Sequence, residues 1–200
     1  PTDSNGDNNY EVTVKLSDTS NPQEYDYQEF RIKVIASSNT SLKENFFHVS
    51  PTGSDTSGDG TLANPYATIQ NAIGHSRENG IIYLLPGTYQ GSGNRNLSVN
   101  SKSIRLKSTE GSLKTIIDCG GNSIASVRDN AQLFLDGLTI QNAKKSFGTK
   151  YQRSGLVDIK NSSYLEAQNC IFLRNEITAG SAANTSIIHI SSDSQADITN

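Results

Sequence analysis

The fold of this chain is decided by three stretches that repeat one pattern: Ile124-Ala-Ser-Val-Arg-Asp-Asn-Ala-Gln-Leu-Phe-Leu-Asp-Gly137, Leu156-Val-Asp-Ile-Lys-Asn-Ser-Ser-Tyr-Leu-Glu-Ala-Gln-Asn169 and Ile187-Ile-His-Ile-Ser-Ser-Asp-Ser-Gln-Ala-Asp-Ile-Thr-Asn200. Successive copies start 32 and 31 residues apart, without a gap. Each copy holds two short runs in which apolar and polar residues alternate, which is typical of strands with one buried face. A repeat of about 30 residues built from short strands indicates a solenoid of stacked coils.

Aligning the copies places apolar residues in columns that point into a common core. The columns are Val127, Ile159 and Ile190; Leu133, Leu165 and Ala196; and Leu135, Ala167 and Ile198. A third short strand follows at 138–140 and at 170–172. Three strands per coil predict a parallel β-helix, because a leucine-rich horseshoe would need one strand and a helix. Asp136-Gly137 and Gln168-Asn169 fit the tight turns between strands, since Gly and Asn tolerate positive φ.

The composition supports an all-β protein and excludes several function classes. Of the 200 residues, 34% are hydrophobic and 18% are charged, too few of either for a helical bundle or coiled coil. The net charge of −3 argues against a general nucleic-acid binder. No apolar run approaches the roughly 18 residues that span a bilayer. The two cysteines, Cys119 and Cys170, are interpreted as buried free thiols, with a single disulfide as the alternative.

The chain divides into two regions joined by a linker. Apolar and polar residues alternate at 10–14 and at 30–34, so residues 1–35 are predicted to hold a pair of strands from a β-sandwich. Residues 36–45 are polar and aperiodic and are predicted to be the linker. Residues 46–200 are predicted to form the beginning of the β-helix, with truncation in mid-coil at residue 200.

One helix is expected near the start of the β-helix. Ile69, Ala72 and Ile73 have helical spacing, and Pro65 is placed in the first turn. Because the open end of a solenoid exposes apolar strands, this helix is predicted to cap it.

The second region resembles a known family. His48-Val-Ser-Pro-Thr-Gly-Ser-Asp55 and Ile82-Tyr-Leu-Leu-Pro-Gly-Thr-Tyr89 resemble the opening of bacterial pectate-lyase-like right-handed β-helix proteins, and Asn169-Cys-Ile-Phe-Leu-Arg-Asn175 looks like a repeat of the polymorphic outer-membrane protein type. The resemblance covers residues 46–200. It implies the fold more than the function, because this fold carries lyases, hydrolases, esterases and adhesins.

The first region resembles the later half of a bacterial cadherin-like repeat, through residues 1–14 and Leu16-Ser-Asp-Thr-Ser-Asn-Pro22. Candidate calcium ligands are Asp3, Asn5, Asp7 and Asp18. Calcium takes six to eight oxygen ligands, and alternating Asp and Asn on a turn present several. The resemblance implies calcium at a junction between repeats, and the alternative is a solvated polar turn. Both families imply an extracellular or cell-surface location.

Two polar columns mark a candidate site on the β-helix. Residues beside an inward-facing position point outward, which stacks Ser126, Asp158 and His189 in one column and sets Arg128 beside Lys160 in the next. In pectate-lyase-like enzymes the strand after the long loops carries the substrate groove. By that analogy, Asp158 would bind Ca²⁺, which acidifies the C5 proton of the uronate, and Lys160 or Arg128 would abstract that proton. His189 completes the candidate catalytic group, and ordinary solvent-facing charges are the alternative.

The loop between residues 142 and 155 combines basic and aromatic side chains. It contains Lys144, Lys145, Phe147, Lys150, Tyr151 and Arg153. Basic groups beside aromatic rings suit an anionic sugar, and the alternative is a solvated lysine-rich loop.

The sequence therefore favours a non-enzymatic module of a large secreted or surface-displayed bacterial protein. Its role would be adhesion or binding of a polysaccharide or cell-surface glycan, with an anionic glycan favoured and cadherin-like repeats as neighbours. The alternative is a carbohydrate-active enzyme, either a glycoside hydrolase or, in preference, a Ca²⁺-dependent polysaccharide lyase with most active coils beyond residue 200. A structural spacer without a ligand is the third possibility.

Overall fold

The computed structural model describes residues 9–17, 25–33, 45–147, 154–179, 185–191 and 193–199. The chain forms two compact units, residues 1–43 and 44–200. In the first unit, β1 (Asn9–Ser17) pairs antiparallel with β2 (Tyr25–Lys33), as the alternating pattern predicts. The described residues of this unit contain these two strands alone, so the cadherin-like sandwich stays a prediction. The four candidate calcium ligands, Asp3, Asn5, Asp7 and Asp18, lie outside the described residues.

The second unit is a parallel β-helix with three sheets. The first sheet contains β3 (Phe46–Val49), β4 (Gly80–Leu84), β7 (Ser103–Ser108), β10 (Gln132–Asp136), β14 (Tyr164–Gln168) and β18 (Gln195–Thr199). The second contains β5 (Gly87–Tyr89), β8 (Thr115–Asp118), β11 (Thr139–Gln141) and β15 (Ile171–Leu173). The third contains β6 (Leu97–Asn100), β9 (Ala125–Arg128), β13 (Ser154–Lys160) and β17 (Thr185–Ile190).

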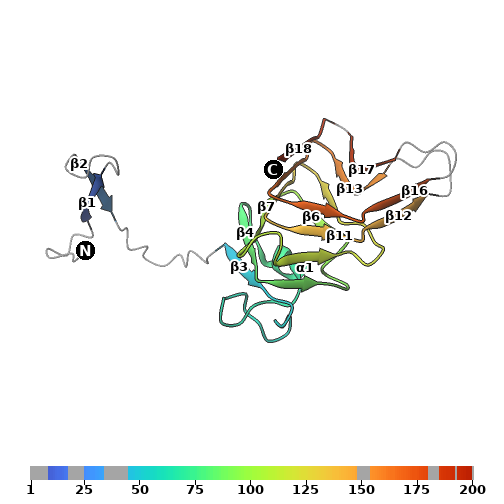
Figure 1. Cartoon of the computed structure of the whole chain (residues 1–200), viewed down its shortest axis with the longest axis horizontal. Helices are drawn as coiled ribbons and strands as arrows, with labels where there is room; N and C mark the ends of the chain where they lie inside the picture. The colour runs from blue at the N-terminus through green and yellow to red at the C-terminus, as the bar shows by residue number, and fades with distance from the viewer. Residues whose placement is uncertain are drawn as a thin grey trace. The chain divides into compact units, whose positions relative to one another are not determined.

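From β4 onward the chain visits the three sheets in turn, and every neighbouring pair within them is parallel. Figure 1 shows equivalent strands of successive coils side by side, such as β13 and β17 of the third sheet. A further pair, β12 (Lys144–Phe147) and β16 (Glu176–Ala179), forms a small parallel sheet between the second and third strands of the later coils.

The predicted inward columns form the core of this unit. Val127 lies opposite Ile159 and Leu133 opposite Leu165, and all four side chains are fully buried. The ends of two columns depart from the prediction, because Ile190 is 45% exposed and Ile198 is 53% exposed. These residues lie on β17 and β18, the last strands of their sheets, so a neighbouring coil covers them on one side only.

The tight turns follow the predicted chemistry. Gly137 has φ of 67° and Asn169 has φ of 54°, both in the left-handed region. The Asn169 side-chain amide donates a hydrogen bond to Asp136 Oδ1 at 3.2 Å, which ties one coil to the next. The turn residues therefore serve both the local bend and the stacking of coils.

Helix α1 (Ile69–His75) lies against β3, β4 and β6, where it covers the first coil. Its apolar face, Ile69, Ala72 and Ile73, is buried as predicted. The expectation that Pro65 occupies the first turn was wrong, because Thr68 is the N-cap and accepts a hydrogen bond from the backbone N–H of Asn71. No helix in the part of the chain that the structure describes is long and apolar enough to cross a membrane.

Both cysteines are free and buried, so the alternative of a disulfide was wrong. Burial raises the pKa of Cys119 to about 12 and also raises the pKa of Cys170. At neutral pH each thiol is therefore protonated and fills core volume as a small apolar group.

Candidate functional site

The third sheet carries the candidate catalytic residues on its outer face. Strand register places Asp158 between Ser126 and His189, and it places Lys160 opposite Arg128. Residues from three successive coils therefore meet on one surface. The parallel pairing that aligns the inward columns also aligns these polar ones.

Asp158 is almost covered, although its position on the strand faces outward. Only 7% of the residue is exposed, because Lys145 reaches over it from β12. The Lys145 ammonium lies 3.0 Å from Asp158 Oδ2, and His189 Nδ1 lies 3.8 Å from Asp158 Oδ1. His189 Nδ1 is buried and makes no hydrogen bond to any described residue, and its contact with the carboxylate is an ion pair only when the imidazole is protonated. The Asp158 carboxylate therefore lies between the Lys145 ammonium and the His189 imidazole.

The basic loop is partly a strand, and the two lysines that the sequence grouped together have different partners. Lys144 lies opposite Glu176, and their side chains form an exposed ion pair at 3.1 Å. The hydrogen bond from Lys144 lowers the pKa of Glu176. Lys145, the next residue along β12, contacts Asp158 instead. Successive side chains of β12 point to opposite faces of its sheet, so the two ammonium groups lie apart.

The rest of the predicted sugar-binding group cannot be placed with them. Lys150, Tyr151 and Arg153 lie outside the described residues, and so does the side chain of Phe147. Of that group, the structure positions only the side chains of Lys144 and Lys145.

Arg128 and Lys160 form an adjacent pair of cations on the outer surface. Arg128 is exposed and Lys160 is half-buried. Arg128 Nε donates a hydrogen bond to Ser126 Oγ at 2.6 Å. Within the described ranges neither side chain has a carboxylate partner. Like charges on directly opposed strand positions oppose folding, so this pair lacks a structural explanation of its own.

The described carboxylates do not gather into a cluster. Across residues 45–147, 154–179, 185–191 and 193–199, no group of three or more His, Cys, Asp or Glu side chains is arranged to hold a metal ion. Asp158 faces Lys145 and His189 rather than a second carboxylate.

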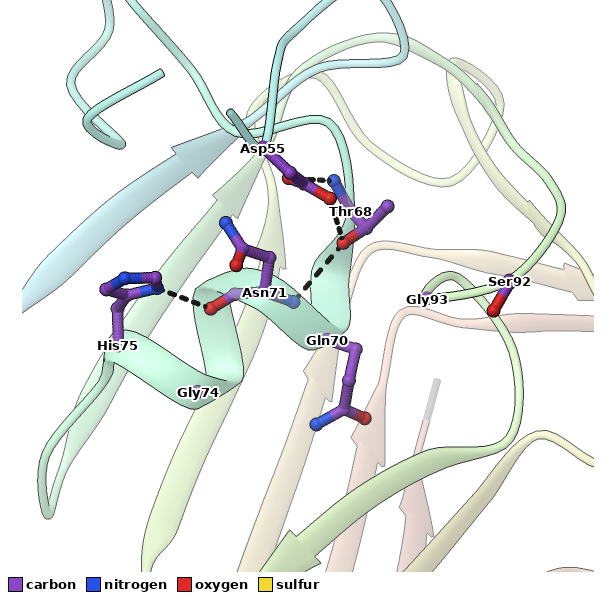
Figure 2. Close-up of a pocket in the computed structure, with 8 residues that line it drawn as sticks. All are labelled: Asp55, Thr68, Gln70, Asn71, Gly74, His75, Ser92 and Gly93. Carbon is purple, nitrogen blue, oxygen red and sulfur yellow. Dashed lines mark hydrogen bonds between the residues drawn. The ribbon is translucent and has the colours of Figure 1, made fainter. Parts of the chain in front are cut away.

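A hollow of about 450 Å³ lies beside α1 (Figure 2). Its polar groups mostly bond within the protein. Asp55 accepts hydrogen bonds from the backbone N–H groups of Ala67 and Thr68 and from the Thr68 hydroxyl. Gln70 exchanges two hydrogen bonds with the backbone of Ser98. The hollow is therefore built from groups that cap the helix and close the edge of β6.

A second hollow, of about 280 Å³, lies on the outer face of the first sheet. Arg105 and Phe134 line it, and the guanidinium carbon sits 4.5 Å from the centre of the ring. Sequence reasoning missed this site because it followed the outer face of the third sheet alone. The signal was available, since Ile104-Arg-Leu106 and Leu133-Phe-Leu135 occupy the same column in successive coils.

No family model matches the chain, and no curated protein matches it. Among solved structures, a rhamnogalacturonan lyase is similar with a TM-score of 0.45 and 19% identity over 62% of this chain. The chain corresponds to 36% of the length of that protein. The assignment of a parallel β-helix rests on the strand pairing described above.

Proposed function

We propose that the β-helix is a non-enzymatic glycan-binding module that holds an anionic polysaccharide on the outer face of the third sheet. The observation that carries this proposal is the adjacent pair Arg128 and Lys160, which has no described carboxylate partner. A polyanion bound along the stacked strands would neutralise both charges at once.

The geometry of the pair suits a polymer. Neighbouring strands are spaced by about 4.8 Å, so cations on successive coils form a line along the axis of the solenoid. A polysaccharide with a carboxylate on each sugar presents anionic groups in a line of its own. When the carboxylates of the polysaccharide bind along the row of cations, their negative charge offsets the repulsion between Arg128 and Lys160, which otherwise opposes folding. In this proposal the module belongs to a secreted or surface-displayed protein with adhesive function.

A second candidate function is a polysaccharide lyase, favoured by the contact among Lys145, Asp158 and His189 next to the cation pair. Such an enzyme would release unsaturated uronates, and their absorbance would rise with time. An experiment with polygalacturonate in the presence and absence of Ca²⁺ separates the candidates. We expect binding without turnover in both conditions.

Affinity electrophoresis or calorimetry with polygalacturonate tests the binding proposal on the full chain. The double variant Arg128→Gln and Lys160→Gln should weaken binding by at least about tenfold, because each charge-assisted contact contributes about 1.5–3 kcal/mol. Lys144→Gln is the matched control, since its charge is already paired with Glu176. Equal affinity for the double variant and the wild type would refute the proposal.

A further inference from the structure

We infer that the 280 Å³ hollow on the first sheet is a second carbohydrate site, which takes a single carboxylate-bearing sugar ring. It lies on a different sheet from Arg128 and Lys160 and shares no residue with them. The inference therefore extends the proposed function without depending on it.

The hollow is formed where three coils meet on the first sheet. Ile81, Arg105 and Phe134 occupy one register column across β4, β7 and β10. Arg105 lies over the Phe134 ring, and Tyr164 meets the same ring edge-on with centroids 5.9 Å apart. These contacts hold the guanidinium and the ring in fixed positions beside the hollow, so little side-chain entropy is lost on binding.

Among the described residues that line the hollow, Arg105 alone carries a charge. Its guanidinium lies against Phe134, and within the described part of the chain it makes no hydrogen bond. The neighbouring cation, Lys107, is instead paired with Asp136 at 3.0 Å. Arg105 therefore keeps its donors for a ligand, and a planar guanidinium matches a carboxylate through two parallel hydrogen bonds.

The other lining groups favour a sugar over a simple anion. The side-chain amides of Asn79 and Gln132 line the hollow and make no hydrogen bond to any described residue. An amide both donates and accepts, as a sugar hydroxyl requires of its partner. Phe134 and Ile81 add apolar surface for the C–H groups of a ring. The volume is just below the range of about 300–1,000 Å³ that is usual for small-ligand sites, which suits one ring rather than an oligosaccharide.

Three small probes separate the contributions of carboxylate and ring. Glucuronate carries both, glucose lacks the carboxylate and acetate lacks the ring. In an NMR titration of the full chain, glucuronate should shift the side-chain amide signals of Asn79 and Gln132 and bind at least about tenfold more tightly than glucose or acetate. Acetate or inorganic phosphate binding as tightly as glucuronate would overturn the inference in favour of a simple anion site.

Two variants test the role of the guanidinium. Arg105→Gln should weaken glucuronate binding by at least about tenfold. Lys107→Gln, which removes the same charge from the same strand outside the hollow, should change it by less than about twofold. Thermal unfolding of both variants verifies that the β-helix is intact. Unchanged affinity for Arg105→Gln, or no glucuronate-dependent shift in the wild type, would overturn the inference.

The two carbohydrate sites can fail independently. The double variant Arg128→Gln and Lys160→Gln should leave the glucuronate shifts of Asn79 and Gln132 unaltered. Loss of those shifts in the double variant would show that glucuronate binds on the third sheet and would overturn the assignment to the first. If a glutamate-rich peptide displaced glucuronate and bound more tightly, the inference of a sugar site would be overturned in favour of a site for an acidic protein partner.

Discussion

Asp158 shows how one contact can remove an outward-facing side chain from solvent. Its place on the strand faces outward, yet Lys145 covers it and leaves 7% of it exposed. The pair is therefore poorly solvated, and the loss of either member leaves a charge that water only partly compensates. Lys144 and Glu176 form a comparable pair one position earlier along β12, but in open solvent.

The buried pair should contribute measurably to stability. We expect Asp158→Asn to lower the free energy of unfolding by about 1–3 kcal/mol, because the Lys145 ammonium loses its carboxylate in a partly buried place. Urea denaturation measures the difference. Glu176→Gln provides the control and should change stability little, since that pair is exposed. A loss for Glu176→Gln as large as that for Asp158→Asn would contradict this account.

Asp136 should make stability depend on pH in the acid range. Burial tends to raise its pKa, but hydrogen bonds from Lys107 and Asn169 outweigh burial and leave the pKa lowered. A lowered pKa in the folded state adds stability above the unfolded value of about 4, and this stability is lost as pH falls through the folded pKa. The advantage of wild type over Asp136→Asn, about 1 kcal/mol at neutral pH, should therefore shrink between about pH 5 and pH 2. Denaturation across that range measures it, and a pH-independent difference would contradict the linkage.

At the scale of elements, α1 depends on side chains from outside the helix. Asp55 accepts hydrogen bonds from the backbone N–H groups of Ala67 and Thr68, and these bonds fix the position of the N-cap residue Thr68. At the other end, the Lys102 ammonium donates hydrogen bonds to the carbonyls of Ile73 and Ser76. With seven residues, the helix is too short to be stable alone, and these bonds and its buried face maintain it.

Removing the N-cap should weaken the cover over the first coil. Thr68→Ala loses the acceptor for the Asn71 N–H and the hydroxyl that bonds Asp55, so we expect a loss of about 0.5–2 kcal/mol. Thr68→Ser keeps both bonds and serves as the control. Thermal unfolding of the two variants measures the loss of stability. An equal loss in both variants would show that the methyl group of Thr68, and not its hydroxyl, provides the stabilisation.

At the scale of the whole molecule, the second unit holds the core that the structure describes. The buried apolar side chains run from Phe47 to Cys170, and they form one continuous cluster. The parallel sheets surround this cluster, while α1 covers it at the first coil. Such an arrangement has the apolar surface that independent folding requires.

The second unit should therefore fold without the first. We expect a protein of residues 44–200 to unfold cooperatively, with a Tm within about 3 °C of the full chain. Circular dichroism on heating provides the measurement, and the full chain is the reference. Loss of a cooperative transition would show that residues 1–43 contribute to the folding of the β-helix.

The amino-acid sequence by itself determined the coil, the inward columns, the tight turns and the apolar face of the helix. These features repeat at fixed intervals or depend on near neighbours, so alternation and turn chemistry reveal them. The same periodicity brought Asp158, His189, Arg128 and Lys160 to one face, although no pattern indicated how their charges would be paired.

Only the tertiary structure decided the environment of those charges. Lys145 covers Asp158 because β12 lies beside the third sheet, and the contact joins residues 13 apart in the chain. The hollow at Arg105 likewise depends on Phe134 from the next coil and on the space left between their side chains. Burial, pairing and cavities arise from side-chain volumes and directions summed over several strands, and a one-dimensional pattern of apolar and polar residues does not contain them.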